Sequence, residues 1–367
     1  MCSSDLKDVL VTALQIAESH DDLRLHLWIL WALWALQLNV GECREAQLTA
    51  ERYARVALRT GDPASILSGH RLLGMALQFG GDQHEARRAL AWALEPSFSE
   101  QDSPQPGWPR QHRAIALATL ARTLWLQGSV IQARDMARES FDLACARPPI
   151  FTRFEVLRLA VGPIAFRSGD LAAAERAVTA MAELAANTNA VSWKVTSDAY
   201  EGVLLVRRGE FERGLTLLTA VLDAYEKTGW KSAYTQGLGV FAEGLAGLGR
   251  LADAVATIDM ALAAADRSGE RWYVAEHLRL KGEFLLQESG DNAIPVAEGL
   301  FREALAFARE QGALSWELRT AVSLARLKVR QGRRTEAREI LAPVYHQFTE
   351  GFETADLGAA RETLEVL

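Results

Sequence analysis

The segment Gln331-Gly332-Arg333-Arg334-Thr335-Glu336-Ala337 decides the fold, because its pattern recurs along the whole chain. A helical pattern ends at the glycine, a short polar turn follows, and an alanine comes five residues later in the next helix. Other copies lie at Gly41/Ala46, Gly81/Ala86, Gly128/Ala133, Gly169/Ala174 and Gly249/Ala254, with glycine for alanine at Gly209/Gly214 and a stretched form at Gly290/Ala297. Eight copies predict a repeat protein.

The spacing of the copies predicts the repeating unit. Measured between the alanine positions, it is 40, 47, 41, 40, 40, 43 and 40 residues. Apolar residues inside the units recur at helical intervals, and no alternating runs of β-branched residues occur. We therefore expect an all-α fold, a right-handed α-solenoid of about eight helix-turn-helix repeats with a period of about 40 residues.

Glycines and other small residues mark the end of the second helix and the packing position of the first helix in each unit. Fifteen residues after the turn alanine, glycine closes the second helix at Gly61, Gly229, Gly269 and Gly312. Twelve residues before the alanine, the first helix carries a small residue, at Gly74, Ala121, Gly162, Gly202, Ala242 and Ala325. A glycine inside a helix costs roughly 1 kcal/mol, so its recurrence predicts a close helix–helix approach. The small-then-alanine spacing resembles the tetratricopeptide repeat, with longer helices than that family's 34-residue unit.

The irregular segments suggest the domain boundaries. Residues 95–112 contain four prolines and are expected to form a proline-rich insertion loop. Residues 1–6 can be back-translated to contain the end of a sequencing-adapter oligonucleotide, so we expect them to be a non-native leader. Residues 7–367 are expected to form a single tetratricopeptide-like solenoid.

Composition argues against several classes of function. A net charge of −7 with both signs interspersed gives no general attraction to nucleic acid or to anionic membranes. Three cysteines without metal or redox spacing suit a reducing cytoplasm. The longest apolar run, Leu27 to Leu36, is shorter than the roughly 20 residues needed to cross a bilayer. We expect a cytoplasmic protein with no membrane contact and no direct nucleic acid contact by this region.

No segment carries a catalytic or cofactor pattern. The chain has no phosphate-binding Gly-x4-Gly-Lys-Ser/Thr loop and no nucleophile elbow, and its seven histidines form no cluster with cysteine. Glu276 and His277 lack the third group that an acid–base site needs. We expect no enzyme activity, no metal and no cofactor in this chain.

The expected functional surface is geometric, because the first helices of tetratricopeptide-like arrays line a concave groove. Phased from the small residue, the groove positions are Arg71, Phe79, Arg122, Trp125, Phe166, Arg167, Arg207, Glu243, Glu276, Arg279, Glu283, Arg319, Arg326 and Arg330. The first half of this set is basic and aromatic, which favours an acidic or carboxylate-terminated peptide or a small anionic molecule. The tryptophans Trp193, Trp230, Trp272 and Trp316 precede or begin first helices and are expected to fill gaps between repeats.

Three segments near the C-terminus carry a resemblance to a known family. They are 270–283 (ERWYVAEHLRLKGE), 311–319 (QGALSWELR) and 341–357, which begins LAPVY and continues through FTEGFETADL. Together they resemble the C-terminal helical-repeat region of bacterial predicted ATPases of the signal-transducing NTPase type. Those proteins often begin with a winged-helix DNA-binding domain, and some relatives carry a nucleotide cyclase domain instead. The similarity covers roughly residues 21–367, and no ATP-binding residue of the family has a matching position.

The resemblance implies that this chain is the sensing arm of an ATP-dependent transcriptional regulator, with the NTPase domain of the parent protein as a partner. The arm would bind a peptide, a protein or a small anionic ligand in its groove. A free-standing adaptor that binds a peptide partner is the alternative. An authentic start codon or an in-frame P-loop domain upstream would distinguish these two interpretations.

Overall fold

A computed structural model describes residues 3–95, 108–146 and 149–367, and these residues are helical with no β-strand among them. The helices are α1 (Ser3–Ser19), α2 (Leu23–Asn39), α3 (Cys43–Thr60), α4 (Pro63–Gly80), α5 (Gln83–Ala93), α6 (Trp108–Leu126), α7 (Val130–Cys145), α8 (Ile150–Val156), α9 (Gly162–Arg167), α10 (Leu171–Ala186), α11 (Val191–Arg207), α12 (Phe211–Thr228), α13 (Tyr234–Gly247), α14 (Leu251–Ser268), α15 (Val274–Ser289), α16 (Ile294–Gln311), α17 (Leu314–Arg330), α18 (Arg334–Tyr345) and α19 (Ala355–Glu365).

The helices pair as the repeat predicts. Within the described residues the pairs are α2/α3, α4/α5, α6/α7, α8–α9/α10, α11/α12, α13/α14, α15/α16 and α17/α18, with α1 before them and α19 after them. Each turn alanine lies in the first turn of the second helix of its pair, and all seven, Ala46 being the first and Ala337 the last, are fully buried. The expected all-α solenoid of about eight helix pairs is confirmed.

The glycines act as the sequence predicts. Gly332 in the turn of the last pair has φ +76°, a left-handed conformation that side chains with a Cβ rarely adopt. Gly74 allows the predicted close approach, because a Cβ there would lie 2.6 Å from Leu90 Cγ in the partner helix. Gly202 repeats this contact, at 2.7 Å from Leu218 Cγ. Repeated glycine in mid-helix is thus explained by packing rather than by flexibility.

The two irregular segments fall only partly within the described residues. Residues 96–107 of the expected proline-rich loop lie outside them. The end of that segment differs from the prediction, because α6 begins at Trp108 and residues 108–112 are helical. Of the expected leader, residues 1–2 lie outside the described residues and residues 3–6 belong to α1, so its non-native origin stays a prediction.

The fourth repeat contains a local change of helix type. Its first helix is interrupted by a π-helical segment, Leu157–Val161, between α8 and α9. Gly162 N donates to Leu157 O, which is the i→i+5 pattern of a π-helix. The next bond in that pattern would require an N–H on Pro163, which proline lacks. The carbonyl of Arg158 is therefore left free to accept a hydrogen bond from outside its own helix.

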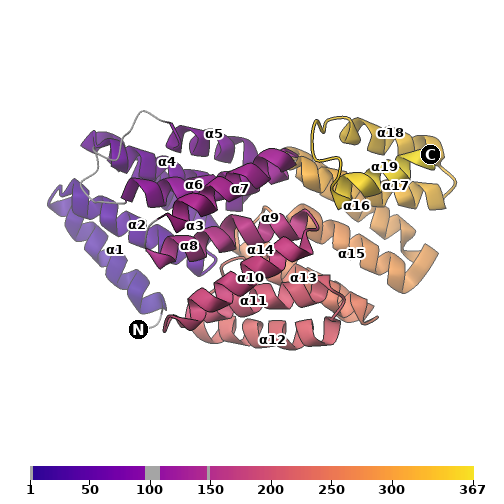
Figure 1. Cartoon of the computed structure of the whole chain (residues 1–367), viewed down its shortest axis with the longest axis horizontal. Coiled ribbons are helices and arrows are strands. Elements are labelled where there is room, and N and C mark those ends of the chain that lie inside the picture. The colour runs from indigo at the N-terminus through magenta and orange to yellow at the C-terminus, as the bar shows by residue number, and fades with distance from the viewer. Residues whose placement is uncertain (1–2, 96–107, 147–148) are drawn as a thin grey trace.

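The superhelix closes on itself, which places the two halves of the chain in contact (Figure 1). We call α2–α10 the first coil and α13–α19 the second coil. Residues at the start of α13, α15 and α17, or just before these helices, bond to the last turns of α2, α4 and α6, about 190 residues earlier in the chain. Lys231 N donates to Asn39 O at 2.7 Å, Arg271 N donates to Phe79 O at 3.0 Å, and Ser315 Oγ donates to Trp125 O at 2.5 Å. We call these three contacts the seam.

The seam continues at the surface near the C-terminus. Glu350 Oε1 accepts hydrogen bonds from the backbone N–H groups of Ile131 (2.8 Å) and Gln132 (3.2 Å) at the start of α7. Arg134 forms an ion pair with Glu353 at 2.5 Å. Buried side chains of both coils belong to one hydrophobic core, since Trp272, Tyr273 and Trp316 pack with residues of α2, α4 and α6. The second coil thus covers much of the interior face of the first coil.

Candidate functional site

The predicted groove residues lie largely inside the molecule. The repeat pattern predicts an open concave face, but in the structure the second coil covers the first-coil part of it. Six of the predicted positions are less than one-tenth exposed, namely Arg71, Phe79, Arg122, Trp125, Arg167 and Glu276. The helix positions read from the sequence therefore predicted where these side chains point, because they do face the superhelix axis. It did not predict that the axis is enclosed, and their role in binding stays a prediction.

The first coil presents arginines stacked on aromatic rings. Each arginine lies over a ring from the preceding repeat, at 5.5 Å for Arg71 over Trp34, 4.8 Å for Arg122 over Phe79 and 5.2 Å for Arg167 over Trp125. We call these three pairs the arginine ladder. The arginines lie 15, 11 and 7 residues before the turn alanines Ala86, Ala133 and Ala174, so they share one helix face but move one helical turn along it from each repeat to the next.

The second coil inserts a tryptophan into this ladder. Trp272, which is fully buried, is contacted by Arg122 at 4.8 Å and by Arg167 at 4.9 Å. Its indole N–H donates to Glu270 at 3.2 Å. The predicted gap-filling role of Trp272 fits this packing. The gap that its indole ring fills lies between the two coils as well as between repeats.

None of the three ladder arginines forms an ion pair with a described residue, although the charge of Glu270 acts on Arg122. Among the described residues, the terminal nitrogens of Arg167 and Nε of Arg122 have no hydrogen-bond partner. Burial and the neighbouring Arg167 lower the pKa of Arg122 to about 9, and burial lowers the pKa of Arg167 to about 10. The latter corresponds to a penalty of about 3 kcal/mol on the charged form. Cation–π contacts return roughly 0.5–2 kcal/mol each, so an anion at Arg167 would stabilise the fold.

Second-coil positions of the predicted groove are paired with one another. Glu276 accepts two hydrogen bonds of 2.8 Å from Arg279 and one of 3.1 Å from Arg319. Burial alone would raise the pKa of Glu276, but the two guanidiniums outweigh it and hold this pKa at about 2. Arg319 also pairs with Asp356 at 2.9 Å. These charges are neutralised within the chain and offer little to a ligand.

Five of the remaining predicted positions are also paired or hydrogen-bonded within the chain, and the sixth, Phe166, lines the first cavity described below. Arg207 forms a two-pronged pair with Glu243, with both bonds at 2.9 Å. Glu283 lies 3.8 Å from Arg279. Arg330 pairs with Asp291 at 2.6 Å, and Arg326 donates to Thr363 at 3.3 Å. Arg326 and Arg330 are exposed, and neither lines the interior cavities described next.

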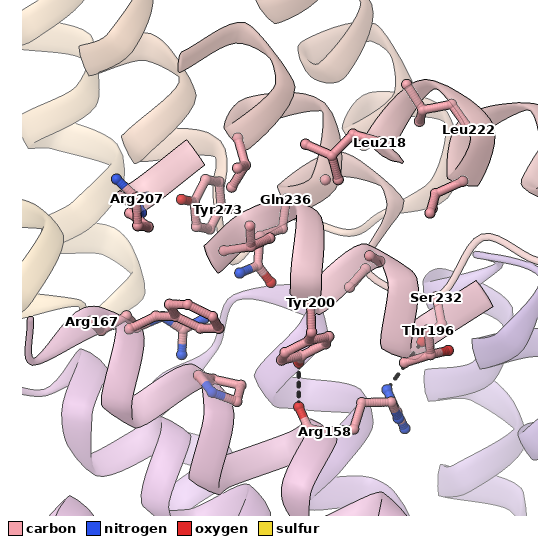
Figure 2. A pocket seen from close by; sticks show the side chains of 18 of the residues that line it. Arg158, Arg167, Thr196, Tyr200, Arg207, Leu218, Leu222, Ser232, Gln236 and Tyr273 are labelled. Carbon is pink, nitrogen blue, oxygen red and sulfur yellow. Dashed lines mark hydrogen bonds between the residues drawn. The ribbon is translucent and has the colours of Figure 1, made fainter. Parts of the chain in front are cut away.

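Arg167 lines a cavity of about 140 Å³, which we call the inner cavity (Figure 2). Its polar lining includes Arg158, Arg167, Tyr200, Arg207, Gln236, Tyr273 and Arg319. One wall is apolar and comes from Val203, Leu218, Val221, Leu222 and Val240. Figure 2 shows Arg167, Tyr200 and Gln236 reaching this space from separate helices. Apolar walls with a few convergent polar groups are typical of ligand sites.

The π-helical segment fixes one side of the inner cavity. The Tyr200 hydroxyl donates at 2.5 Å to the carbonyl of Arg158, the group that Pro163 leaves without a helical partner. Arg158 in turn pairs with Glu155 at 2.5 Å and donates to Ser232 at 3.4 Å. The bond to the Arg158 carbonyl therefore holds Tyr200 against the cavity before any ligand binds, and the side-chain contacts of Arg158 fix that residue in turn.

A second space of about 340 Å³ adjoins the inner cavity, and we call it the aromatic hollow. The two share Arg158, Thr196 and Ser232 in their linings. Aromatic rings dominate the hollow, from Trp31, Trp34, Phe79, Phe151, Phe154, Trp193 and Trp230. Trp193 stacks on Phe154 with ring centres 4.3 Å apart. Trp28, three residues before Trp31 in α2, lies outside the hollow and is 65% exposed.

Sequence reasoning missed several residues of this interior. Tyr200, Arg158, Tyr273 and Gln236 were not among the predicted positions, because they come from helix faces or loops that only the closed superhelix brings to the axis. Pro163 next to a mid-helix glycine was a usable signal for the irregular helix. The tryptophans before the first helices were recognised, but only as fillers between repeats.

Two further observations bear on the type of site. Among the described residues, no group of three His, Cys, Asp or Glu side chains is placed to hold a metal ion. Likewise, none of their helices is long and apolar enough to cross a membrane.

No protein-family model matches the sequence, and no curated protein matches it significantly. Solved structures do match. A Rap protein complexed with Competence and Sporulation Factor aligns with a TM-score of 0.55 and 13% identity, over 82% of this chain and 78% of that chain. A tetratricopeptide repeat protein from Parabacteroides merdae aligns with a TM-score of 0.43 and 12% identity, over 83% and 96%.

A signal transduction ATPase with numerous domains and a tetratricopeptide repeat sensor, from Pyrococcus horikoshii, aligns with a TM-score of 0.45 and 12% identity. That alignment covers 98% of this chain and 54% of the other. At such identities the likeness shows the fold alone. Of these three, the Rap protein supports it by TM-score, and the chain shares the helical-repeat solenoid fold of that structure.

Proposed function

We propose that this chain is a ligand-sensing interaction module that binds a peptide in the interior of its superhelix. The observation that carries the proposal is the inner cavity with Arg167, a buried guanidinium whose terminal nitrogens have no partner among the described residues. The aromatic hollow beside it supplies stacking surface for further residues of an extended ligand. The similarly folded Rap protein is itself complexed with a factor, which agrees with a binding role.

We further propose that the module is the regulatory arm of an ATP-dependent transcriptional regulator. This part rests on the sequence resemblance of residues 270–283, 311–319 and 341–357. Ligand binding between the coils would alter the seam, because Trp125 and Trp272 each pack against Arg167. The backbone of each tryptophan also forms a hydrogen bond to the other coil at the seam. Full switching of such an arm needs about 10⁴-fold preference of the ligand for one arrangement.

Peptide selection tests the binding role. A displayed library of linear peptides is selected on the immobilised chain, and the affinities of the selected sequences are measured by calorimetry. Trp230→Ala, which opens the aromatic hollow, is expected to weaken their binding by about tenfold or more. Trp28→Ala is the matched control, since this tryptophan is exposed and outside the hollow. Equal affinities for the two variants, or no selected peptide, would contradict the proposal.

A free-standing adaptor remains the second candidate, and the enclosed interior suits it equally. The genomic sequence upstream separates the two. An in-frame P-loop domain supports the regulatory arm. A stop codon followed by an authentic start supports the adaptor.

A further inference from the structure

We infer that the inner cavity is a carboxylate pocket, in which Arg167 binds the carboxylate of an apolar residue or apolar acid whose body packs on Leu218, Val221 and Leu222. This inference rests on the proposed function and assigns chemistry to one end of the ligand. The contacts of Arg167 show what is lacking. Its guanidinium lies between the rings of Trp125 and Trp272, and both its terminal nitrogens remain without an acceptor in the described part of the chain.

The charge balance of the lining specifies a single negative charge. Four arginines line the inner cavity, and three are neutralised, Arg158 by Glu155, Arg207 by Glu243 and Arg319 by Glu276 and Asp356. Arg167 is the one without an ion pair among the described residues. One uncompensated guanidinium fits one carboxylate, which its planar fork binds with two parallel hydrogen bonds. A phosphate dianion would leave a second buried negative charge unpaired.

The size of the inner cavity limits the apolar body. Its volume is about 140 Å³. An engineered apolar cavity of roughly 150 Å³ accommodates one benzene ring. The space opposite Arg167 therefore fits one leucine- or phenylalanine-sized group. A longer ligand must continue through the boundary at Thr196 and Ser232 into the aromatic hollow. This gives a peptide a direction, with its C-terminus at Arg167 and its preceding residues among the tryptophans.

Matched acids and amides test the carboxylate pocket by calorimetry. The probes are N-acetyl-phenylalanine and its amide, and a hexapeptide ending in phenylalanine as free acid and as amide. We expect each acid to bind about tenfold or more tightly than its amide, as a buried charge-assisted hydrogen-bond pair requires. A hexapeptide acid that binds more tightly than N-acetyl-phenylalanine identifies a peptide as the source of the carboxylate. Equal affinities of the two acids identify a free apolar acid.

Substitutions at Arg167 complete the test. Arg167→Met is expected to abolish the preference for acids, whereas Arg167→Lys retains the charge and part of the preference. Arg213→Met is the control, because Arg213 is exposed on α12 and pairs with Glu210 away from the cavity. Circular dichroism and thermal melting establish that each variant is folded. Acid and amide of equal affinity, no acid binding up to about 10 mM, or an intact preference in Arg167→Met overturns the inference.

Failure here and failure of the proposed function give different results. If selected peptides lose affinity in Trp230→Ala but show no preference for a free carboxylate, the interaction module stands and the carboxylate pocket is wrong. If no peptide is selected while N-acetyl-phenylalanine still discriminates through Arg167, the carboxylate pocket stands and the peptide-binding module is wrong.

Discussion

The arginines of the two coils lie on the same face of their helices and face the same axis, yet they are stabilised differently. In the first coil, Arg122 and Arg167 lie against aromatic rings and form no ion pair with a described residue. In the second coil, Arg279 and Arg319 share the buried carboxylate of Glu276. The second arrangement is complete, whereas the first leaves a charge for a ligand to neutralise. This contrast locates the candidate site in one half of a repetitive molecule.

The largest expected effect comes from making the second coil resemble the first. Glu276→Gln leaves Arg279 with only the more distant Glu283, and Arg319 with only Asp356. Breaking a buried ion pair on one side costs about 3–5 kcal/mol, so we expect the free energy of unfolding in urea to fall by that amount. Glu283→Gln is the control and should cost less than about 1 kcal/mol. A loss in Glu276→Gln as small as in the control would show that the contrast has no energetic basis.

Glu270 offers the second-largest effect, because it is a second-coil carboxylate without a close ion pair. Burial raises its pKa to about 7, against the hydrogen bonds from Trp272 and Thr235 and the charge of Arg122. A raised carboxyl pKa contributes stability below the unfolded pKa of about 4.5, and this is lost as the pH rises through about 7. Glu270→Gln should match the wild type at pH 4 and exceed its free energy of unfolding by about 3 kcal/mol at pH 8.

The measurement for Glu270 is urea unfolding followed by circular dichroism at a series of pH values. Glu243→Gln serves as the comparison, since Glu243 is paired with Arg207 and its removal should destabilise the chain. Parallel pH curves for Glu270→Gln and the wild type would contradict the expected titration of Glu270.

Replacing Arg167 should change the free energy of unfolding by an intermediate amount. The sign should be opposite to that for replacing an arginine that has an ion pair. Without ligand, Arg167→Met removes an uncompensated buried charge and keeps an apolar stem against Trp125 and Trp272. We expect the free energy of unfolding to rise by about 1–3 kcal/mol. Arg319→Met should instead lower it, because Glu276 and Asp356 lose a partner. Equal destabilisation of both variants, measured in urea, would remove the distinction between the two coils.

The smallest effect tests the contact between the coils. Ser315→Ala removes the buried hydrogen bond to the Trp125 carbonyl and should cost about 1 kcal/mol or somewhat more, since the carbonyl loses its donor. Arg134→Ala removes an ion pair at the exposed end of the same contact and should cost less than about 1 kcal/mol. Thermal melting of both variants gives the order, and a larger loss for Arg134→Ala would indicate that the coils are held at their rim.

The sequence was most informative about the repeat because the repeat is a local property. A left-handed glycine at Gly332, a buried alanine at Ala337 and a glycine at Gly74 facing Leu90 each depend on residues within one helix pair. The period near 40 and the phase of the inward positions follow from these contacts, and both are found in the structure. The expected loop was predicted less well, because proline composition does not set where α6 begins.

The candidate site depended on contacts between residues of different repeats, which no pattern within one helix pair records. They are 43 positions apart for Arg319 and Glu276, and 150 for Trp272 and Arg122. The sequence by itself determined that Arg122 and Arg167 point inwards, since their phase is fixed by the neighbouring helix. Only the tertiary structure decided that Trp272 would lie between them, that Arg319 would find Glu276, and that Arg167 would be buried without a partner. The physical reason is that superhelix closure accumulates small rotations over many repeats, and it is this closure that turns a groove into a cavity.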